Sequence, residues 1–326
     1  MSTLAMVTGA NGHLGNNLVR QLLARGQQVR AGVRDPQDCP ALNGLDCQVV
    51  RAELQDFDSL RRSLQGVDVL YQVAAVFKHW AKNPQAEIIE PNVQGTRNVL
   101  RAAAEAGVRR VVYVSSVAAV GHDGQYLDES VWNTDQQNPY YLSKILAERV
   151  AWQAAQDYGL SMVTVLPSAI IGPHAERLTD TMGFLAAVLA RKLVLDPDFH
   201  FNFVDVRDVA DGLIRAAEKG RPGQRYILAN RDSSSLAEVV EALNTLRPGY
   251  RPPHRTPKAL LMLVALLQEW RARLTGQPAE LLISQVRMFH GVRQRYCIDK
   301  AVNELGYQPR PPQQALRQAF EYLLAR

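Results

Sequence analysis

The sequence predicts an α/β fold: a doubly wound parallel sheet with a smaller, mostly helical C-terminal region that interleaves with it. Three observations predict this class. From residue 4 to about 170, short β-branched runs alternate with longer segments of helical period, which is typical of stacked β-α-β units. A glycine-rich turn follows the first run. After Pro167 the alternation weakens, and proline-rich turns separate short helical pieces.

Six strands are expected in the first half, each a short apolar run bounded by turn residues. They span residues 4–7, 29–33, 48–51, 67–73, 111–115 and 162–166. The first helix has its apolar face at Leu14, Leu18 and Leu22, and Gly26 is placed to end it. A later helix over 93–106 is followed by Gly107 in the same way.

Length and composition indicate an ordinary globular protein. The 326 residues suit one large α/β domain or a domain with a smaller appendage, and 47% hydrophobic with 21% charged residues is close to the globular average. The net charge of +5 comes from scattered Lys and Arg residues, so nucleic acid is not an expected partner. Cys39, Cys47 and Cys297 have no Cys-x-x-Cys spacing, which argues against a disulfide framework or a metal site and favours the cytoplasm.

No export signal or membrane span is expected. The N-terminus lacks a basic segment followed by a long apolar one. The longest apolar run, residues 259–267, is far shorter than the roughly 20 residues that a transmembrane helix needs. A buried helix or a substrate lid is the preferred interpretation of this run, and membrane contact is the less favoured alternative.

The turn after the first strand predicts a dinucleotide site. Gly9 can adopt the tight turn, Gly12 lets the backbone approach a pyrophosphate, and Gly15 allows close helix packing. The N-terminus of the following helix offers unpaired N–H groups and a partial positive charge to the anion. We therefore expect a dinucleotide-binding Rossmann domain over 1–170. Residues 171–326 are then mainly a substrate-binding region, with 201–229 returning to the sheet.

The residue that follows the second strand indicates whether the protein prefers NADP or NAD. An arginine there accommodates the 2′-phosphate of NADP, whereas an acidic residue accepts a hydrogen bond from the ribose of NAD. Arg34 follows this strand and favours NADP. Asp35 is its neighbour, so NAD stays the alternative cofactor.

A second pattern predicts a proton donor. Tyr140 and Lys144 are four residues apart and share one face of a helix whose start is marked by Asn138 and Pro139. An adjacent ammonium favours the phenolate and is expected to bring the Tyr140 pKa toward the working range. The fifth strand ends at Ser115 and Ser116, which are interpreted either as substrate-orienting hydroxyls or as strand-end caps.

Together these residues resemble the extended short-chain dehydrogenase/reductase superfamily, and within it the dihydroflavonol reductase, cinnamoyl-CoA reductase and 3β-hydroxysteroid dehydrogenase-like branch. The resemblance covers most of the chain. It is carried by the motifs at 8–15, 33–36, 92–100, 115–116, 140–144, 166–173 and 205–210.

The resemblance implies roles for individual residues. Ser116, five residues before Gly121, orients the substrate, Tyr140 is the acid/base, and Lys144 lowers the Tyr140 pKa and binds the nicotinamide ribose. Glu53 stands where the family usually has Asp, so this adenine contact is a departure from the pattern. The implied cofactor-binding residues are Gly9, Asn11, Gly12, His13, Leu14, Gly15, Arg34, Glu53, Leu54, Ala74, Ala75, Tyr140, Lys144, Pro167, Ser168 and Ile170.

The implied reaction is NADPH-dependent reduction of an aldehyde or ketone, or oxidation of the alcohol in reverse, with NAD as the other cofactor choice. Two alternatives stay open: a nucleotide-sugar epimerase and a non-catalytic NADP-binding sensor. A dehydratase of this kind would carry an acidic pair directly after the active serine, and here Val117 and Ala118 stand there. A sensor would have no need of Ser116, Tyr140 and Lys144 together.

The substrate half is rich in apolar side chains, which suits a hydrophobic or aromatic carbonyl compound. The same side chains could equally form core. They are Val76, Phe77, Trp80, Met182, Phe184 and Leu185. Lys78 and His79 follow the fourth strand and are interpreted as a solvated loop, with substrate contact as the alternative. The protein is expected to be a monomer or a homodimer.

Overall fold

The computed structural model describes residues 3–78, 80–277 and 279–326. Within these residues a sheet of seven parallel strands runs in the order β10-β7-β5-β4-β1-β2-β3. The strands are β1 (Leu4–Thr8), β2 (Gln28–Val33), β3 (Gln48–Arg51), β4 (Val69–Gln72), β5 (Arg110–Val114), β7 (Met162–Pro167) and β10 (Arg225–Leu228). The chain starts in the middle of the sheet and winds outward to both edges, so the predicted doubly wound class and its six strands are confirmed.

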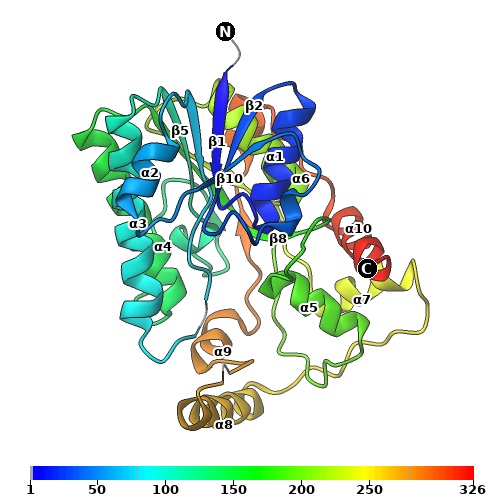
Figure 1. Ribbon diagram of the computed structural model, residues 1–326. Coiled ribbons are helices and arrows are strands. Elements are labelled where there is room, and N and C mark those ends of the chain that lie inside the picture. The colour runs from blue at the N-terminus through cyan, green and yellow to red at the C-terminus, as the bar shows by residue number, and fades with distance from the viewer. Residues whose placement is uncertain (1–2, 79, 278) are drawn as a thin grey trace.

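Helices cover both faces of this sheet (Figure 1). One face carries α1 (His13–Ala24) and α6 (Val206–Lys219). The opposite face carries three helices, α2 (Phe57–Ser63), α3 (Glu90–Glu105) and α4 (Pro139–Asp157). Each face has its own buried apolar cluster, which is the reason that the strands are apolar on both sides.

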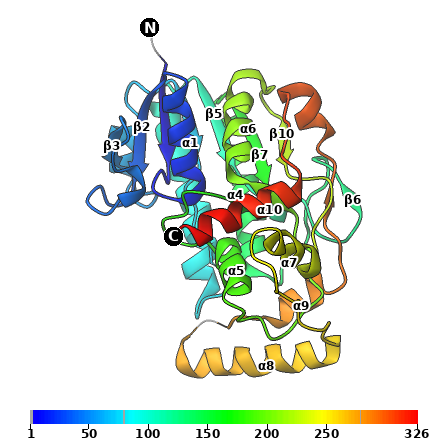
Figure 2. The same cartoon turned by 90° about the vertical axis from the view of Figure 1, so that its right-hand side faces the viewer.

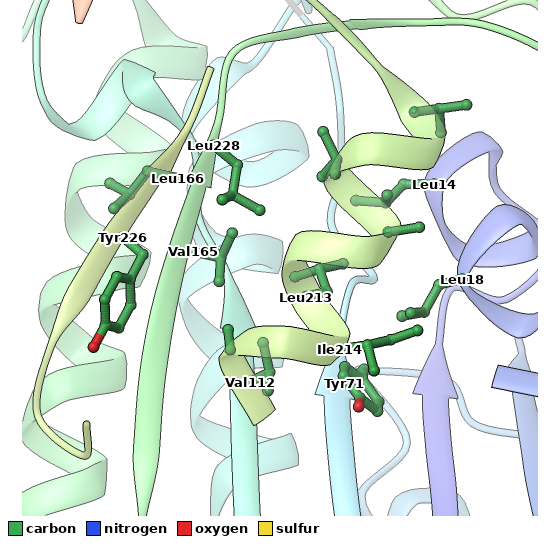
Figure 3. Packing of buried hydrophobic residues seen from close by; sticks show 14 of the residues in the cluster. Leu14, Leu18, Tyr71, Val112, Val165, Leu166, Leu213, Ile214, Tyr226 and Leu228 are labelled. Carbon is green, nitrogen blue, oxygen red and sulfur yellow. The ribbon is translucent and has the colours of Figure 1, made fainter. Parts of the chain in front are cut away.

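Figure 3 shows the packing on the α1 and α6 face. Leu213 and Ile214 of α6 point toward sheet residues such as Val165 and Tyr71, and Leu14 of α1 lies beside α6. The predicted helix ends are confirmed. Gly26 (φ 72°) follows α1 and Gly107 (φ 69°) follows α3, each in the left-handed conformation that ends a helix.

The C-terminal half forms a smaller lobe below the sheet in the view of Figure 2. Its buried cluster lies among α5 (Asp180–Leu189), α7 (Leu236–Asn244), α10 (Pro312–Leu324) and the paired strands β8 (Ala169–Ile171) and β9 (Phe203–Asp205). The remaining elements are α8 (Lys258–Thr275), α9 (Ile283–Phe289), β6 (Tyr126–Leu127), β11 (Arg295–Tyr296), η1 (Pro40–Leu42), η2 (Gln85–Ile89), η3 (Val117–Ala119) and η4 (Ala301–Leu305).

The two halves interleave, and residues 201–229 return in part to the main sheet. β10 pairs in parallel with β7 at the sheet edge, and α6 packs on α1. β9 differs from the expectation, because it pairs with β8 in a separate two-stranded sheet. β9 has only three residues and directly precedes α6, so its sequence is too short to indicate which strand it pairs with.

The apolar run at 259–267 forms half of α8, and the prediction of a buried helix is wrong for most of its side chains. Leu260, Leu263, Leu266 and Leu267 are 47–57% exposed, whereas only Leu261, Ala265 and Ala272 are buried among the described residues of the helix. Among the described residues we find no helix that combines the length and the apolar composition of a membrane-spanning segment.

Candidate active site

The glycine turn lies between β1 and α1 and is closely packed. Gly9 has φ 65°, and a Cβ added there would lie 2.9 Å from the Cα of Ala74. A Cβ on Gly15 would overlap the carbonyl oxygen of Gly9 and lie 2.9 Å from the Cα of Ala10. Because neither position tolerates a side chain, β1, the turn and α1 are held at the close approach that a pyrophosphate site requires.

The N-terminus of α1 is electrostatically suited to an anion. Gly12 is the N-cap and provides no side-chain cap, and the first turn contains no acidic residue. The His13 side chain turns away, since its Nε2 lies 3.0 Å from the carbonyl oxygen of Pro173, and burial lowers its pKa to about 4. Leu14 is part of the core. His13 and Leu14 therefore offer their backbone N–H groups to this site.

Thr8 joins the ends of β1 and β4 at the point where the strand order reverses. Its hydroxyl donates to Oε1 of Gln72 (2.7 Å) and accepts from the backbone N–H groups of Val73 (3.0 Å) and Ala74 (3.2 Å). Ala74 is partly buried and Ala75 is exposed, and both predicted cofactor-lining alanines follow β4 directly at this point. In doubly wound sheets, ligands bind at such a reversal.

Asn92 fixes the segment that follows β4. Its side-chain amide donates to the Val76 carbonyl (3.0 Å) and to the Ser143 hydroxyl (3.2 Å), and its Oδ1 accepts from the Val76 N–H (2.7 Å). The segment is thereby tied to α4. Sequence reasoning noted Asn92 within a motif but missed this positioning role.

The expected adenosine end of the site contains a pair of opposite charges. Arg34 follows β2 and forms an ion pair with Glu53 (3.1 Å), and the Arg34 side chain is 83% exposed. Asp35 accepts a hydrogen bond from the Gln37 N–H (2.9 Å). Leu54 packs against α3, because a Cβ on Gly95 would lie 2.9 Å from its Cβ. Arg34 is therefore an exposed cation at this end, with its charge partly balanced by Glu53.

Two polar atoms at the carboxyl edge of the sheet are buried without a hydrogen-bond partner in the described part of the chain. They are Oδ1 of Asn11 and Oγ of Ser168, which follows Pro167 at the end of β7. Ile170, by contrast, lies in β8 and packs against the core. Unpartnered buried oxygens are costly unless a ligand satisfies them. With the glycine turn and the uncapped helix, they fit a nicotinamide dinucleotide.

The predicted catalytic side chains come together at the carboxyl edge of the sheet. Asn138 caps α4 by accepting from the N–H groups of Tyr140 (3.0 Å) and Tyr141 (3.3 Å), with Pro139 as the first helical residue. The Ser116 side chain is hydrogen-bonded to the phenol of Tyr140. The Lys144 ammonium lies 6.0 Å from the centre of the Tyr140 ring. Ser116 also caps η3, because its Oγ accepts from the Ala118 N–H (3.1 Å), which confirms the cap interpretation of this serine. Its role in orienting a substrate stays a prediction.

The pKa of Tyr140 differs from the expectation. Burial raises it to about 12, although the hydrogen bond with Ser116 opposes the shift. Burial also lowers the pKa of Lys144 to about 8, and the Glu148 carboxylate opposes that decrease. The expected decrease in the Tyr140 pKa is therefore wrong for this arrangement, because desolvation of the phenol has the largest influence on this pKa and raises it.

A buried ionic network lies one helical turn beyond Lys144. Glu148 accepts hydrogen bonds from Ser115 (2.6 Å), Trp152 (3.3 Å) and Arg225 (2.7 Å). Arg225 lies over the ring of Trp132 at 4.0 Å. Its guanidinium also donates to the carbonyl oxygens of the residues at 129 and 131, at 2.7 and 2.8 Å. Sequence reasoning missed this network, because a glutamate in the middle of a helix usually indicates a solvated surface.

Some of the candidate substrate residues lie in the protein core, and others lie beside the candidate active site. Met182 and Leu185 are fully buried in the C-terminal cluster. Phe184 packs against Phe201, with ring centres 5.3 Å apart. Phe77 is different: it is 45% exposed, and its ring lies edge-on to Tyr140 with centres 4.9 Å apart.

The other candidates lie on the segment after β4. Val76 and Trp80 are partly exposed. Lys78 forms an exposed ion pair with Glu87 (3.5 Å), which fits a solvated loop. His79 lies outside the described residues.

The fold, the glycine turn and the Ser116–Tyr140–Lys144 group have the features of a nucleotide-dependent enzyme of the α/β class. A family model described as the NAD dependent epimerase/dehydratase family matches residues 5–229. The chain belongs to this family, which is part of the extended short-chain dehydrogenases/reductases and binds NAD(P). The resemblance drawn from the sequence motifs is thereby confirmed.

Individual relatives carry reductase names. A putative dihydroflavonol 4-reductase of Synechocystis sp. is 36% identical, covering 98% of this chain and 93% of that protein. The cinnamoyl-CoA reductase CAD2 of Medicago truncatula is 34% identical over 78% of this chain and 84% of that protein. The crystal structure of gox2253 superimposes with a TM-score of 0.86 at 32% identity, covering 99% of this chain and 98% of that chain.

Proposed function

We propose that this protein is a reductase that prefers NADPH and reduces an aldehyde or ketone on a hydrophobic or aromatic scaffold. The observation that carries the proposal is the grouping of Ser116, the buried Tyr140 phenol and the Lys144 ammonium, which lies 6.0 Å from the centre of the phenol ring. Burial favours the protonated phenol, so Tyr140 holds a proton that it can give to a carbonyl oxygen beside it. Donation of a proton to that oxygen is the role that reduction requires.

Each side chain then has a defined part in the reaction. Ser116 holds the carbonyl oxygen beside Tyr140, and Tyr140 donates its proton to that oxygen. Lys144, with its ammonium 6.0 Å from the ring centre, stabilises the phenolate that remains. The reduced nicotinamide, when bound, supplies a hydride to the carbonyl carbon.

Binding of the cofactor follows from the site geometry. The N–H groups at the start of α1 would hold the pyrophosphate, with Gly9, Gly12 and Gly15 allowing the close approach. Asn11 and Ser168 would form hydrogen bonds to the cofactor through their unpartnered oxygens. Arg34 would bind the 2′-phosphate, which is the basis for preferring NADPH.

Phe77 supports an apolar substrate. Its half-exposed ring forms one wall beside Tyr140, and an aromatic or aliphatic group of the substrate would pack on it. The names of the relatives, dihydroflavonol 4-reductase and cinnamoyl-CoA reductase, agree with carbonyl substrates on aromatic scaffolds.

The experiment is a screen of aldehydes, ketones, acyl-CoA esters and hydroxysteroids, followed by the absorbance of NADPH. We expect turnover of at least one apolar carbonyl compound with stoichiometric NADPH consumption. Interconversion of a nucleotide sugar without net cofactor turnover would instead identify an epimerase. Tight NADPH binding without turnover of any probe would favour a sensor. Either of these results contradicts the proposal.

A further inference from the structure

The helix α8 has an unusual arrangement of polar and apolar side chains. Its exposed apolar residues are spaced alternately three and four apart, which places them along one side of the helix. They are Leu260, Leu263, Leu267, Trp270 and Leu274, joined by Leu266, and are 47–67% exposed. We call these six residues the outer face of α8.

The opposite side of α8 is attached to the protein. Leu261 and Ala265 pack in a buried cluster with Phe289 of α9. Two polar side chains also turn inward: Oε1 of Gln268 accepts from the Leu281 N–H (2.9 Å), and Oε1 of Glu269 accepts from the Ile283 N–H (2.8 Å). The orientation of the helix is thus fixed with all its leucines except Leu261 outward. For a surface helix this is the reverse of the usual pattern.

The position of α8 makes its outer face accessible to a flat surface. In Figures 1 and 2 the helix forms the lower edge of the molecule, with α9 and the loops on its upper side. In Figure 2 it lies lengthwise along this edge. A planar partner could therefore contact the helix along its whole length.

The charges beside the outer face are positive. Lys258, Arg271 and Arg273 are exposed on α8, and the only acidic residue of this helix, Glu269, is bonded toward α9. Leucine and tryptophan flanked by lysine and arginine are typical of helices that lie in the interface of a bilayer. Phosphate headgroups of anionic lipids complement these cations.

We propose that the outer face of α8 docks this protein onto the surface of an anionic lipid bilayer. The helix lies in the plane of the interface, with its leucines and Trp270 among the acyl chains and its basic residues at the headgroups. This revises the expectation from the sequence, which favoured a buried helix or lid over membrane contact. The docking does not depend on the proposed reductase activity.

A second copy of the chain fits this face less well. A helix of 18 residues is about 27 Å long and about 10 Å wide, so two such faces would bury roughly 600 Å² in total. Stable protein interfaces bury about 1,000 Å² or more. In a symmetric pair the basic residues of both copies would also face each other.

The test is sedimentation of the full-length protein with vesicles of phosphatidylcholine, alone or mixed with phosphatidylglycerol. We expect the protein to bind the anionic vesicles. Binding should fall about tenfold or more in the triple variant Leu263→Gln/Leu267→Gln/Trp270→Gln, because three apolar side chains no longer enter the interface. Arg271→Gln/Arg273→Gln should weaken binding to the anionic vesicles and leave binding to pure phosphatidylcholine unchanged.

The control is Tyr158→Gln, which removes an exposed aromatic ring (47%) at the end of α4, outside the outer face of α8, and should bind vesicles like the wild type. The triple variant should also keep wild-type turnover of a water-soluble carbonyl substrate, which separates this docking from catalysis. Failure of the wild type to sediment with anionic vesicles would overturn the proposal. Light scattering distinguishes docking onto a second copy. A wild-type protein that is a dimer and does not bind vesicles, together with a triple variant that is a monomer, would assign the outer face of α8 to a second copy instead.

Discussion

Glu148 and Arg225 form an ion pair in the protein interior, with Oε1 of Glu148 2.7 Å from Nε of Arg225 and the two side chains 0% and 8% exposed. The pair joins α4, which carries Tyr140 and Lys144, to β10 at the sheet edge. Glu148 also accepts from Ser115, the neighbour of Ser116. A single carboxylate therefore contacts both segments that carry the predicted catalytic side chains.

Replacing Glu148 with Gln should destabilise the protein and shift its pH profile. Removing one partner of a buried pair leaves the other charge uncompensated, so we expect a loss of about 3 kcal/mol or more in the free energy of unfolding. The Glu148 carboxylate raises the pKa of Lys144, so its removal should lower that pKa below its present value of about 8. The alkaline limb of kcat/KM should then move to lower pH.

The control for this variant is Glu105→Gln, which removes an exposed pair with Arg101 (2.9 Å) on α3. We expect a change within about 0.5 kcal/mol and an unchanged pH profile there. Denaturant titration and rate measurements across the alkaline range make the comparison. A Glu148→Gln enzyme with lower stability but an unshifted pH profile would reduce Glu148 to a purely structural role.

Gly15→Ala should abolish cofactor binding, because the new Cβ would overlap the Gly9 carbonyl oxygen in the turn. The matched control is Gly183→Ala in α5, where a Cβ would meet no atom within 4 Å. Alanine is favoured over glycine inside a helix, so this control should be neutral or stabilising by up to about 1 kcal/mol. Calorimetric titration with NADPH tests both variants. Unchanged affinity in Gly15→Ala would contradict the assigned turn.

Arg34 and Glu53 should have opposite effects on cofactor choice. Arg34→Ala should weaken the binding of NADPH about tenfold and change the affinity for NADH less than about twofold, because only NADPH carries the 2′-phosphate. Glu53→Gln removes the carboxylate that now pairs with Arg34, so it should strengthen NADPH binding. Dissociation constants for both cofactors provide the measurement. Equal affinity of the wild type for NADPH and NADH would count against the preference.

Phe77→Ala tests the apolar wall beside Tyr140. Loss of the ring should raise KM for an aromatic carbonyl substrate about tenfold and affect a small aliphatic aldehyde much less, because only the larger molecule reaches the ring. Steady-state rates on the two substrates make the comparison. An equal change in KM for both would indicate that Phe77 positions Tyr140 and does not select the substrate.

The strands and the glycine turn could be predicted from the sequence because they depend on local patterns. Continuous apolar runs identify buried parallel strands, and the left-handed conformation required at Gly26 and Gly107 marks helix ends directly. The pairing of β9 with β8 could not be predicted, because a strand of three residues carries no information on its partner. The leucines of α8 have the same three-and-four spacing whether they face a core or the outside.

The sequence predicted which side chains come together at the candidate site, but it did not predict their pKa values. Tyr140 and Lys144 share a helix face by spacing alone, and Ser116 follows a strand that can be recognised. The pKa of Tyr140 could not be inferred, because it depends on burial by residues such as Phe77, 63 positions away in the sequence. Glu148 was missed for the same reason: its partner Arg225 lies 77 residues further along the chain.

The role of Tyr140 as proton donor is tested most directly by comparing Tyr140→Phe with Tyr141→Phe on a confirmed carbonyl substrate. Each variant removes one buried phenol oxygen from neighbouring positions of α4, so the two differ chiefly in which hydroxyl is lost. We predict that kcat/KM falls about 10² to 10⁴-fold in Tyr140→Phe, with NADPH affinity nearly unchanged, and stays near the wild-type value in Tyr141→Phe. Near-wild-type turnover by Tyr140→Phe would contradict the assignment.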